Sequence, residues 1–255
     1  MTAALDLAQD DLDPADIDSA QAASVLWVGD LTVLAEHHTA PHGSHSYVVA
    51  HDASVTWGIP GAPQLVAIKV ARNLNLRTFT LESECHASLP FAQAWLIERG
   101  CPPEKIAVPD SDFVEAADEQ TLRIQQMIRD GGQRYDVIDT CTSDDGPCEI
   151  WTLANDTLAT AAPVRVFLEV IDPDTRTYTL REGAFLDEDT ARHWLEDRST
   201  PLPQAPQASP AAHARRERVA LARSSGTPRA AACGLDTLPA ASADTTQQPG
   251  PRRSR

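Results

Sequence analysis

The stretch that decides the fold is VRVFLEVIDPDTRTYTLREGAFLDEDTARHWL, residues 164–195. Residues 164–171 alternate with the period of two that is typical of a β-strand. The turn residues Asp172-Pro173-Asp174 follow, and 176–180 form a second extended run. A helix then begins near Asp187 and carries Trp194 and Leu195. We therefore expect a pair of antiparallel strands covered by a helix.

The alternation also assigns sides to the strand at 164–171. One side is expected to face the core: Val164, Val166, Leu168 and Val170. The other is expected to be partly exposed: Arg165, Phe167, Glu169 and Ile171. On that outer side we expect Arg165, Glu169 and Arg181 to form a charged patch.

Further segments extend this pattern in both directions. Strands are predicted at 134–140 and 149–153, and they complete an antiparallel meander. Helices are predicted from Ser88 to Gly100 and over 117–128. Upstream we predict a tight hairpin at 25–34 around Gly29-Asp30, extended runs at 46–51 and 54–57, and a strand at 77–81. Residues 63–74 are predicted to be a helix, although their β-branched content leaves a strand as the alternative.

These elements predict one α+β domain at 23–199, an antiparallel β-meander covered by helices. Residues 1–22 are rich in Asp and Ala and predict a flexible acidic leader, in which a short helix is the alternative. Residues 200–255 are a mixture of Pro, Ala, Ser and Arg that cannot bury enough apolar surface to offset chain entropy. We expect this tail to be disordered.

The charge is divided unevenly along the chain. Residues 1–199 hold 13 Lys and Arg against 34 Asp and Glu, a balance of −21, whereas 200–255 hold 8 Arg against 3 acids, a balance of +5. So acidic a body repels phosphate backbones, which argues against direct nucleic-acid binding by the folded part. The basic tail remains the one nucleic-acid contact to consider.

Other signals concern location and reaction class. No apolar run approaches the roughly 20 residues needed to span a bilayer, and the acidic N-terminus does not resemble a secretory signal. The five cysteines include no C-x-x-C pair, which favours reduced thiols. We expect a cytoplasmic protein. Lys69 and Lys105, the two lysines, stand in no phosphate-loop motif, and no G-x-G-x-x-G follows a strand.

Clustered histidines give the main candidate for chemistry: AEHHTAPHGSHSYVVAHD, residues 35–52, holds His37, His38, His42, His45 and His51. Pro41 and Gly43 interrupt any helix, so we predict a loop between two extended runs. Strand alternation sends the first two imidazoles to opposite faces. A divalent metal, zinc above all, would take His42 and His45 with one of His37, His38 or His51. Glu36 or Asp52 is then the nearest candidate general base. The spacing matches no specific metal motif, and a structural loop is the alternative.

Three hypotheses for function follow. The first is a non-catalytic, acidic, cytoplasmic binding protein without a cofactor, whose partner is a protein with a basic surface. This hypothesis rests on the negative charge of residues 1–199. The second is a metal-dependent hydrolase in which the histidine cluster lowers the pKa of a bound water. The third is a nucleic-acid mimic whose carboxylates imitate phosphates to inhibit a DNA-binding protein.

Overall fold

The computed structural model of this chain describes residues 11–26, 28–39, 43–55, 61–107, 114–143 and 148–205. Its elements fall into two series, which we call the first half (13–98) and the second half (115–196). The first half consists of β1 (Asp13–Pro14), α1 (Ile17–Val25), β2 (Leu31–His38), β3 (His45–Asp52), β4 (Leu65–Asn73), β5 (Thr78–His86) and α2 (Leu89–Glu98). The second half consists of β6 (Glu115–Ala116), α3 (Glu119–Arg129), β7 (Tyr135–Ser143), β8 (Cys148–Asp156), β9 (Val164–Asp172), β10 (Thr177–Phe185) and α4 (Glu188–Glu196).

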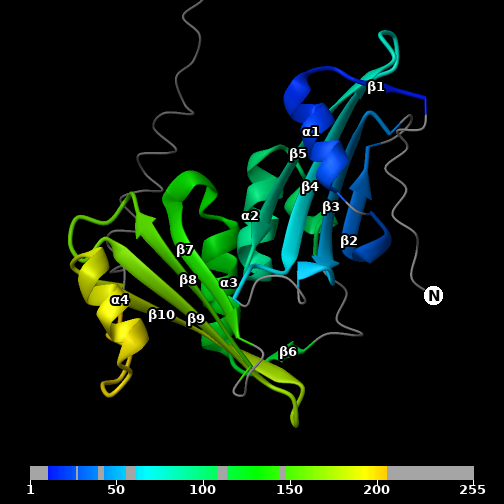
Figure 1. Ribbon diagram of the computed structural model, residues 1–255. Helices are drawn as coiled ribbons and strands as arrows, with labels where there is room; N and C mark the ends of the chain where they lie inside the picture. The colour runs from blue at the N-terminus through cyan, green and yellow to red at the C-terminus, as the bar shows by residue number, and fades with distance from the viewer. Residues whose placement is uncertain are drawn as a thin grey trace, which may run out of the picture. The chain divides into compact units, whose positions relative to one another are not determined.

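Each half builds a five-stranded sheet of the same topology (Figure 1). The strand orders are β1-β5-β4-β3-β2 and β6-β10-β9-β8-β7. Four long strands pair antiparallel, and the short first strand of each half pairs parallel with the last. The α+β class and the antiparallel meander are thus confirmed, but the described residues contain two meanders rather than one.

The two halves are an internal repeat at the level of residues. Residues 65–99 align without a gap with 164–198, and the alignment places RTFTL at 77–81 opposite RTYTL at 176–180. Arg77 and Arg176 both have a φ of 54°, a left-handed conformation in which non-glycine residues are uncommon. Each half also packs an arginine over the tryptophan of its last helix, Arg99 over Trp95 and Arg198 over Trp194.

Buried hydroxyl groups join the first helix to the last strand in the same way in both halves. Ser19 Oγ accepts a hydrogen bond from Leu81 N at 3.2 Å, and Thr121 Oγ1 accepts one from Leu180 N at 3.1 Å. Residues preceding the two helices are aspartates whose side chains accept from the third helical residue, as N-caps do. The shared details indicate that one local design was used twice in this chain.

Four sequence predictions fail in the first half, one of them the extended run at 54–57, because Ser54 and Val55 are not extended and residues 56–57 lie outside the described residues. The hairpin at 25–34 is wrong, because α1 ends at Val25 and a short 3-10 helix covers Val28–Asp30. The helix at 63–74 is also wrong: these residues form β4, which has apolar neighbours on both faces and so lacks polar alternation. Residues 11–22 of the expected flexible leader contain β1 and most of α1. Residues 1–10 and the tail from 206 lie outside the described residues.

Helix α2 lies between the two sheets. Its Trp95 and Leu96 pack on the first sheet, and its Phe91 packs with Phe167 of the second sheet, ring centroids 5.3 Å apart. Seven consecutive residues of α2, 90–96, are buried, as expected for a helix that is apolar all round. Helix α1 covers the other face of the first sheet, and α4 covers the other face of the second.

The second sheet also contains a buried ion cluster. Asp156, at the end of β8, accepts from Arg134 Nε at 2.9 Å and Nη2 at 2.7 Å, and from Arg165 Nη2 at 3.2 Å. The side-chain surfaces of Asp156 and Arg165 are 1% and 6% exposed. Burial by itself would raise the pKa of Asp156, but the hydrogen bonds and charge of Arg134 outweigh it and hold that pKa below its usual value.

Among the described residues, no helix combines the length and apolar character that crossing a bilayer demands.

Candidate functional site

The described histidines of the cluster, His37, His38, His45 and His51, are distributed over β2 and β3 and do not converge on one point. The rings of His37 and His45 both stack on Tyr47, with centroids 6.2 and 6.3 Å away. His38 points to the other face, where its Nδ1 lies 2.7 Å from Ser46 Oγ. The alternation predicted for the first two histidines is therefore present, and it leaves His38 apart from the other two.

The remaining members of the predicted site also lie apart. His51 is at the far end of β3 from His45, about 20 Å away by strand rise, and its Nε2 lies 3.2 Å from Gln64 Oε1. Asp52 caps the following turn through Ser54 N, and Glu36 lies 3.6 Å from His38 Nε2. His42 lies outside the described residues. Within the part of the chain that the structure describes, no three metal-ligating side chains gather at one point.

The separation of His45 and His51 makes a prediction about metal binding. One ion has ligand nitrogens about 2.1 Å away, so these two imidazoles cannot hold the same ion. We expect His51→Ala to leave the zinc content of the purified protein, measured by atomic emission, unchanged whatever the effect of His45→Ala. A loss of the same equivalent of zinc in each of the two single variants would show that the two histidines share one ion.

Residues of the outer side predicted for β9 do not form one charged patch. Arg165 is buried with Asp156, and Arg181 pairs with Asp118 at the N-terminus of α3. Glu169 faces a cavity. Both faces of β9 are covered, one by α4 and the other by α2 and α3, so alternation in the sequence could not reveal an exposed side.

One end of the first half carries an acidic, apolar surface. It consists of Asp11, Asp13, Asp16, Asp18, Ile17, Leu74 and Leu76. Asp13 N donates to Arg77 O at 2.9 Å, which brings β1 beside the turn between β4 and β5 and so places Asp11 and Asp13 near Leu74 and Leu76; Ile17 follows in the first turn of α1 (Figure 1). Ile17, Leu74 and Leu76 are 80%, 52% and 70% exposed. The four aspartates are exposed too, and none forms an ion pair with another described residue.

The second half shows that the fold does not require this surface. The counterparts of Ile17, Leu74 and Leu76 in the repeat are Glu119, Pro173 and Thr175. Both halves nevertheless form the same helix and the same turn. At these three positions, exposed large apolar side chains are thus present in the first half and absent from the second. In the sequence, the two leucines inside the turn NLNLR, where polar residues are usual, are the signal that could have revealed them.

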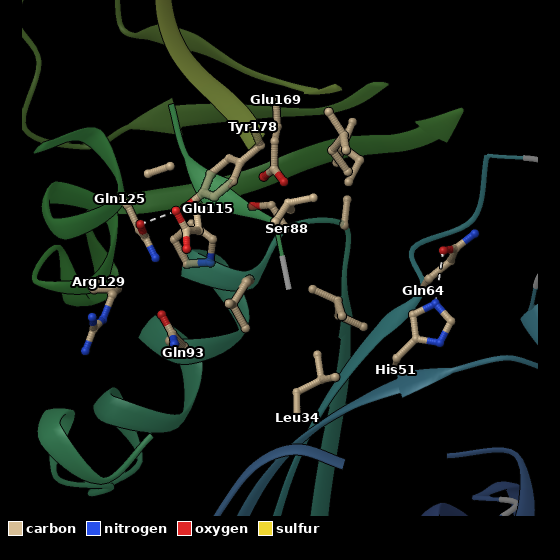
Figure 2. Close-up of a pocket in the computed structure, with 18 of the residues that line it drawn as sticks. Leu34, His51, Gln64, Ser88, Gln93, Glu115, Gln125, Arg129, Glu169 and Tyr178 are labelled. Carbon is tan, nitrogen blue, oxygen red and sulfur yellow. Dashed lines mark hydrogen bonds between the residues drawn. The ribbon is translucent and has the colours of Figure 1, made fainter. Parts of the chain in front are cut away.

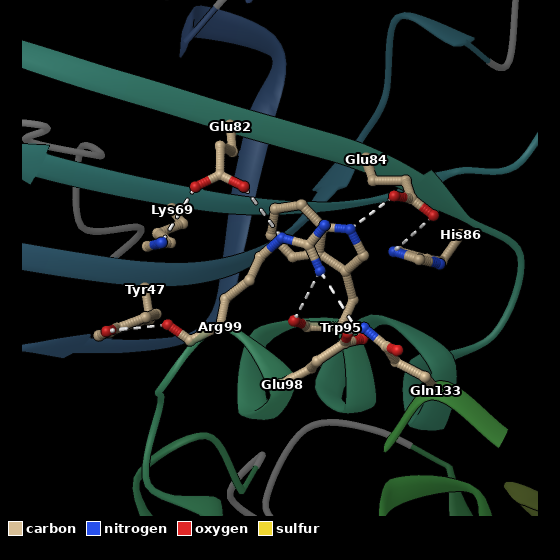
Figure 3. A network of polar contacts seen from close by, with 9 residues as sticks. All are labelled: Tyr47, Lys69, Glu82, Glu84, His86, Trp95, Glu98, Arg99 and Gln133. Atoms are coloured by element: carbon tan, nitrogen blue, oxygen red, sulfur yellow. Dashed lines mark hydrogen bonds and ion pairs between the residues drawn. The ribbon is translucent and has the colours of Figure 1, made fainter. Parts of the chain in front are cut away.

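A polar network covers the α2 face of β5 (Figure 3). Glu82 accepts from Lys69 Nζ at 3.0 Å and Arg99 Nε at 3.1 Å, and Glu84 Oε2 accepts from the Trp95 indole at 2.5 Å. Its neighbour His86 is buried, and burial, helped by the charge of Arg99, lowers the pKa of that imidazole to about 4. Because these groups pair with one another, we assign the network a structural role.

A cavity of about 830 Å³ lies between the halves (Figure 2). Its wall comes from β3 and the start of α2 on one side and from β6, α3 and the second sheet on the other. Figure 2 shows the Glu169 carboxylate pointing from β9 toward Ser88 at the start of α2. That carboxyl makes no hydrogen bond or ion pair with another described residue, and burial raises its pKa to about 7. The wall also includes His51.

No family model, no curated protein and no solved structure matches the chain. The geometry described above is therefore the basis on which a function is proposed.

Proposed function

We propose that this chain is a non-catalytic binding protein that takes a partner protein with a basic surface. The observation that carries the proposal is the acidic, apolar surface of the first half, which the second half lacks. Exposed apolar side chains grouped together and surrounded by polar ones are typical of protein-interaction sites. Partner residues would bury Ile17, Leu74 and Leu76, while basic side chains face the surrounding aspartates.

The charge of the body supports a basic partner. Residues 1–199 carry a formal charge of −21. Arginines of the described residues largely pair elsewhere within the chain, as Arg99, Arg134 and Arg181 do. Arg77, whose Nη2 donates to Asp11 O at 3.1 Å, is the cation beside the aspartates at 11–18, which outnumber it. Such a field speeds association with a cationic protein and weakens as salt screens it.

Substitution of the turn leucines tests the apolar part of the surface. We expect Leu74→Thr/Leu76→Thr to weaken binding of the partner captured from an extract of the source cells by about thirtyfold, because two contacts of about 1 kcal/mol each are lost. Both side chains are exposed, so the free energy of unfolding should change by about 0.5 kcal/mol or less. Capture is quantified by mass spectrometry against the unmodified chain.

The matched control is Leu158→Thr/Leu186→Thr, which changes two equally exposed leucines of the second half. It should leave capture unchanged. For the acidic part, Asp11→Asn/Asp13→Asn/Asp18→Asn should weaken capture at low salt, whereas Glu104→Gln/Asp189→Asn/Glu196→Gln should have a smaller effect. Asp16 is left intact because it caps α1. A partner that tolerates the leucine pair and is indifferent to ionic strength would overturn the proposal.

A further inference from the structure

The wall of the cavity between the halves contains buried hydrogen-bond acceptors without donors. Ser88 and Gln93 are 3% and 1% exposed, and neither Ser88 Oγ nor Gln93 Oε1 has a partner among the described residues. Thr142 Oγ1 is also buried and has no hydrogen-bond partner among the described residues. With the unpaired carboxyl of Glu169, four side chains from both halves can accept a hydrogen bond here. Each buried acceptor left unpaired costs about 1–3 kcal/mol.

Comparison of the two halves shows that the fold does not require these groups. The residue that corresponds to Glu169 in the first half is Val70, which is fully buried in the apolar core. Ser88 corresponds to Asp187, whose carboxylate caps α4 by accepting from Thr190 N at 2.8 Å. Ser88 makes no such capping bond. The second half therefore carries a carboxyl at an apolar position, and α2 begins with a hydroxyl that serves no cap.

The rest of the wall indicates which ligand would fit. Aliphatic side chains contribute much of it: Leu34, Leu65, Leu122, Ile150 and Ile171. Its charged side chains are Glu115, Glu169 and Arg129; Arg129 Nη2 donates to Pro103 O at 3.1 Å, and Arg129 Nε is a buried donor without a partner among the described residues. The cavity thus offers an apolar space with an excess of negative charge and of acceptors.

We infer that this cavity binds a small molecule that has an apolar body and a protonated primary amine. An ammonium group has three donors and no acceptor, which complements the carboxylate of Glu169 and the Ser88 hydroxyl beside it (Figure 2). The alkyl or aryl body would lie against the aliphatic wall. A volume of about 830 Å³ is within the range of small-molecule sites. The site is distinct from the protein-binding surface on the first half and does not depend on it.

Calorimetric titration of the full chain with octylamine, and with 1-octanol as the uncharged probe of equal length, tests the inference. We expect saturable binding of octylamine, with 1-octanol at least tenfold weaker. Glu169→Gln keeps the shape of the side chain and removes its charge. It should weaken octylamine binding at least tenfold and change 1-octanol binding less than twofold. Glu196→Gln, an exposed carboxyl of α4, is the matched control and should change neither.

A pH series gives a second readout. Octylamine binding should weaken below about pH 7, as Glu169 takes up a proton, and this dependence should be absent in Glu169→Gln. Other titratable or charged groups around the cavity are Tyr178 on β10, Glu115 on β6, Arg129 on α3 and His51 on β3. If neither probe saturates, or if Glu169→Gln binds octylamine as tightly as the unmodified chain, the inference is wrong. Circular dichroism checks that both variants are folded.

Discussion

Replacing Asp156 with alanine is expected to lower the free energy of unfolding by about 3–5 kcal/mol, the range found when one partner of a buried ion pair is removed. The substitution leaves the buried Arg165 and the half-buried Arg134 without the carboxylate that they share, and of the two only Arg165 keeps another ion pair within the described residues, with Glu182 at 3.5 Å. It also removes the acceptor for Leu158 N in the turn after β8. Urea denaturation followed by circular dichroism measures the change.

The first half supplies the control for this prediction. Asp52 stands at the corresponding end of β3 and accepts from Ser54 N, as Asp156 does from Leu158 N, but it has no arginine partner among the described residues. Asp52→Ala should therefore cost about 1 kcal/mol, the value of a local turn bond. If the two alanine variants lose equal stability, the ion cluster contributes nothing beyond the turn.

Replacing Glu169 with glutamine is expected to stabilise the protein by about 3 kcal/mol at pH 8, a rare direction for a substitution at a covered position. The folded chain raises the pKa of this carboxyl from 4.5 to about 7. Between these values the folded state keeps a proton that the unfolded state releases, so stability falls as the pH rises through this window. Glutamine has no charge to bury and avoids the loss.

The pH dependence separates this explanation from a packing effect. The stability gained by Glu169→Gln should be near zero at pH 4.5, grow up to about pH 7 and stay constant above it. Thermal denaturation at a series of pH values measures it, with Glu196→Gln as the exposed control. A gain that does not vary with pH would mean that the carboxyl is not held in its neutral form. Together with the octylamine titration, this result would show that Glu169 contributes to ligand binding and lowers the free energy of unfolding.

Most of the second half could be predicted from the sequence. The strand at 164–171, the turn at 172–174 and the helix after Asp187 have clear alternation, turn residues and a cap. Helices α2 and α3 were equally well marked by their ends. These signals are local, so they do not depend on what the element packs against.

Other features could not be read because they depend on packing. Residues 65–73 are covered on both faces, and a continuous apolar run does not distinguish a buried strand from a buried helix. For the same reason the sequence could not show that Glu169 faces a cavity, because its side of β9 is covered by elements from both halves. The repeat of RTFTL as RTYTL was available in the sequence, and it would have separated the two meanders. The sequence left open whether the histidines converge, and the length of β3 keeps His45 and His51 apart.

The two-sided burial of α2 has a consequence for how the molecule loses its structure. Phe91 belongs to the core of the second sheet, while Trp95, one turn later, belongs to the core of the first. Cutting the chain between the repeats would expose one of these faces, so neither repeat is a self-contained folding unit. Melting of the described body should accordingly be a single cooperative transition, in which van't Hoff and calorimetric enthalpies agree, although the chain holds two copies of one design.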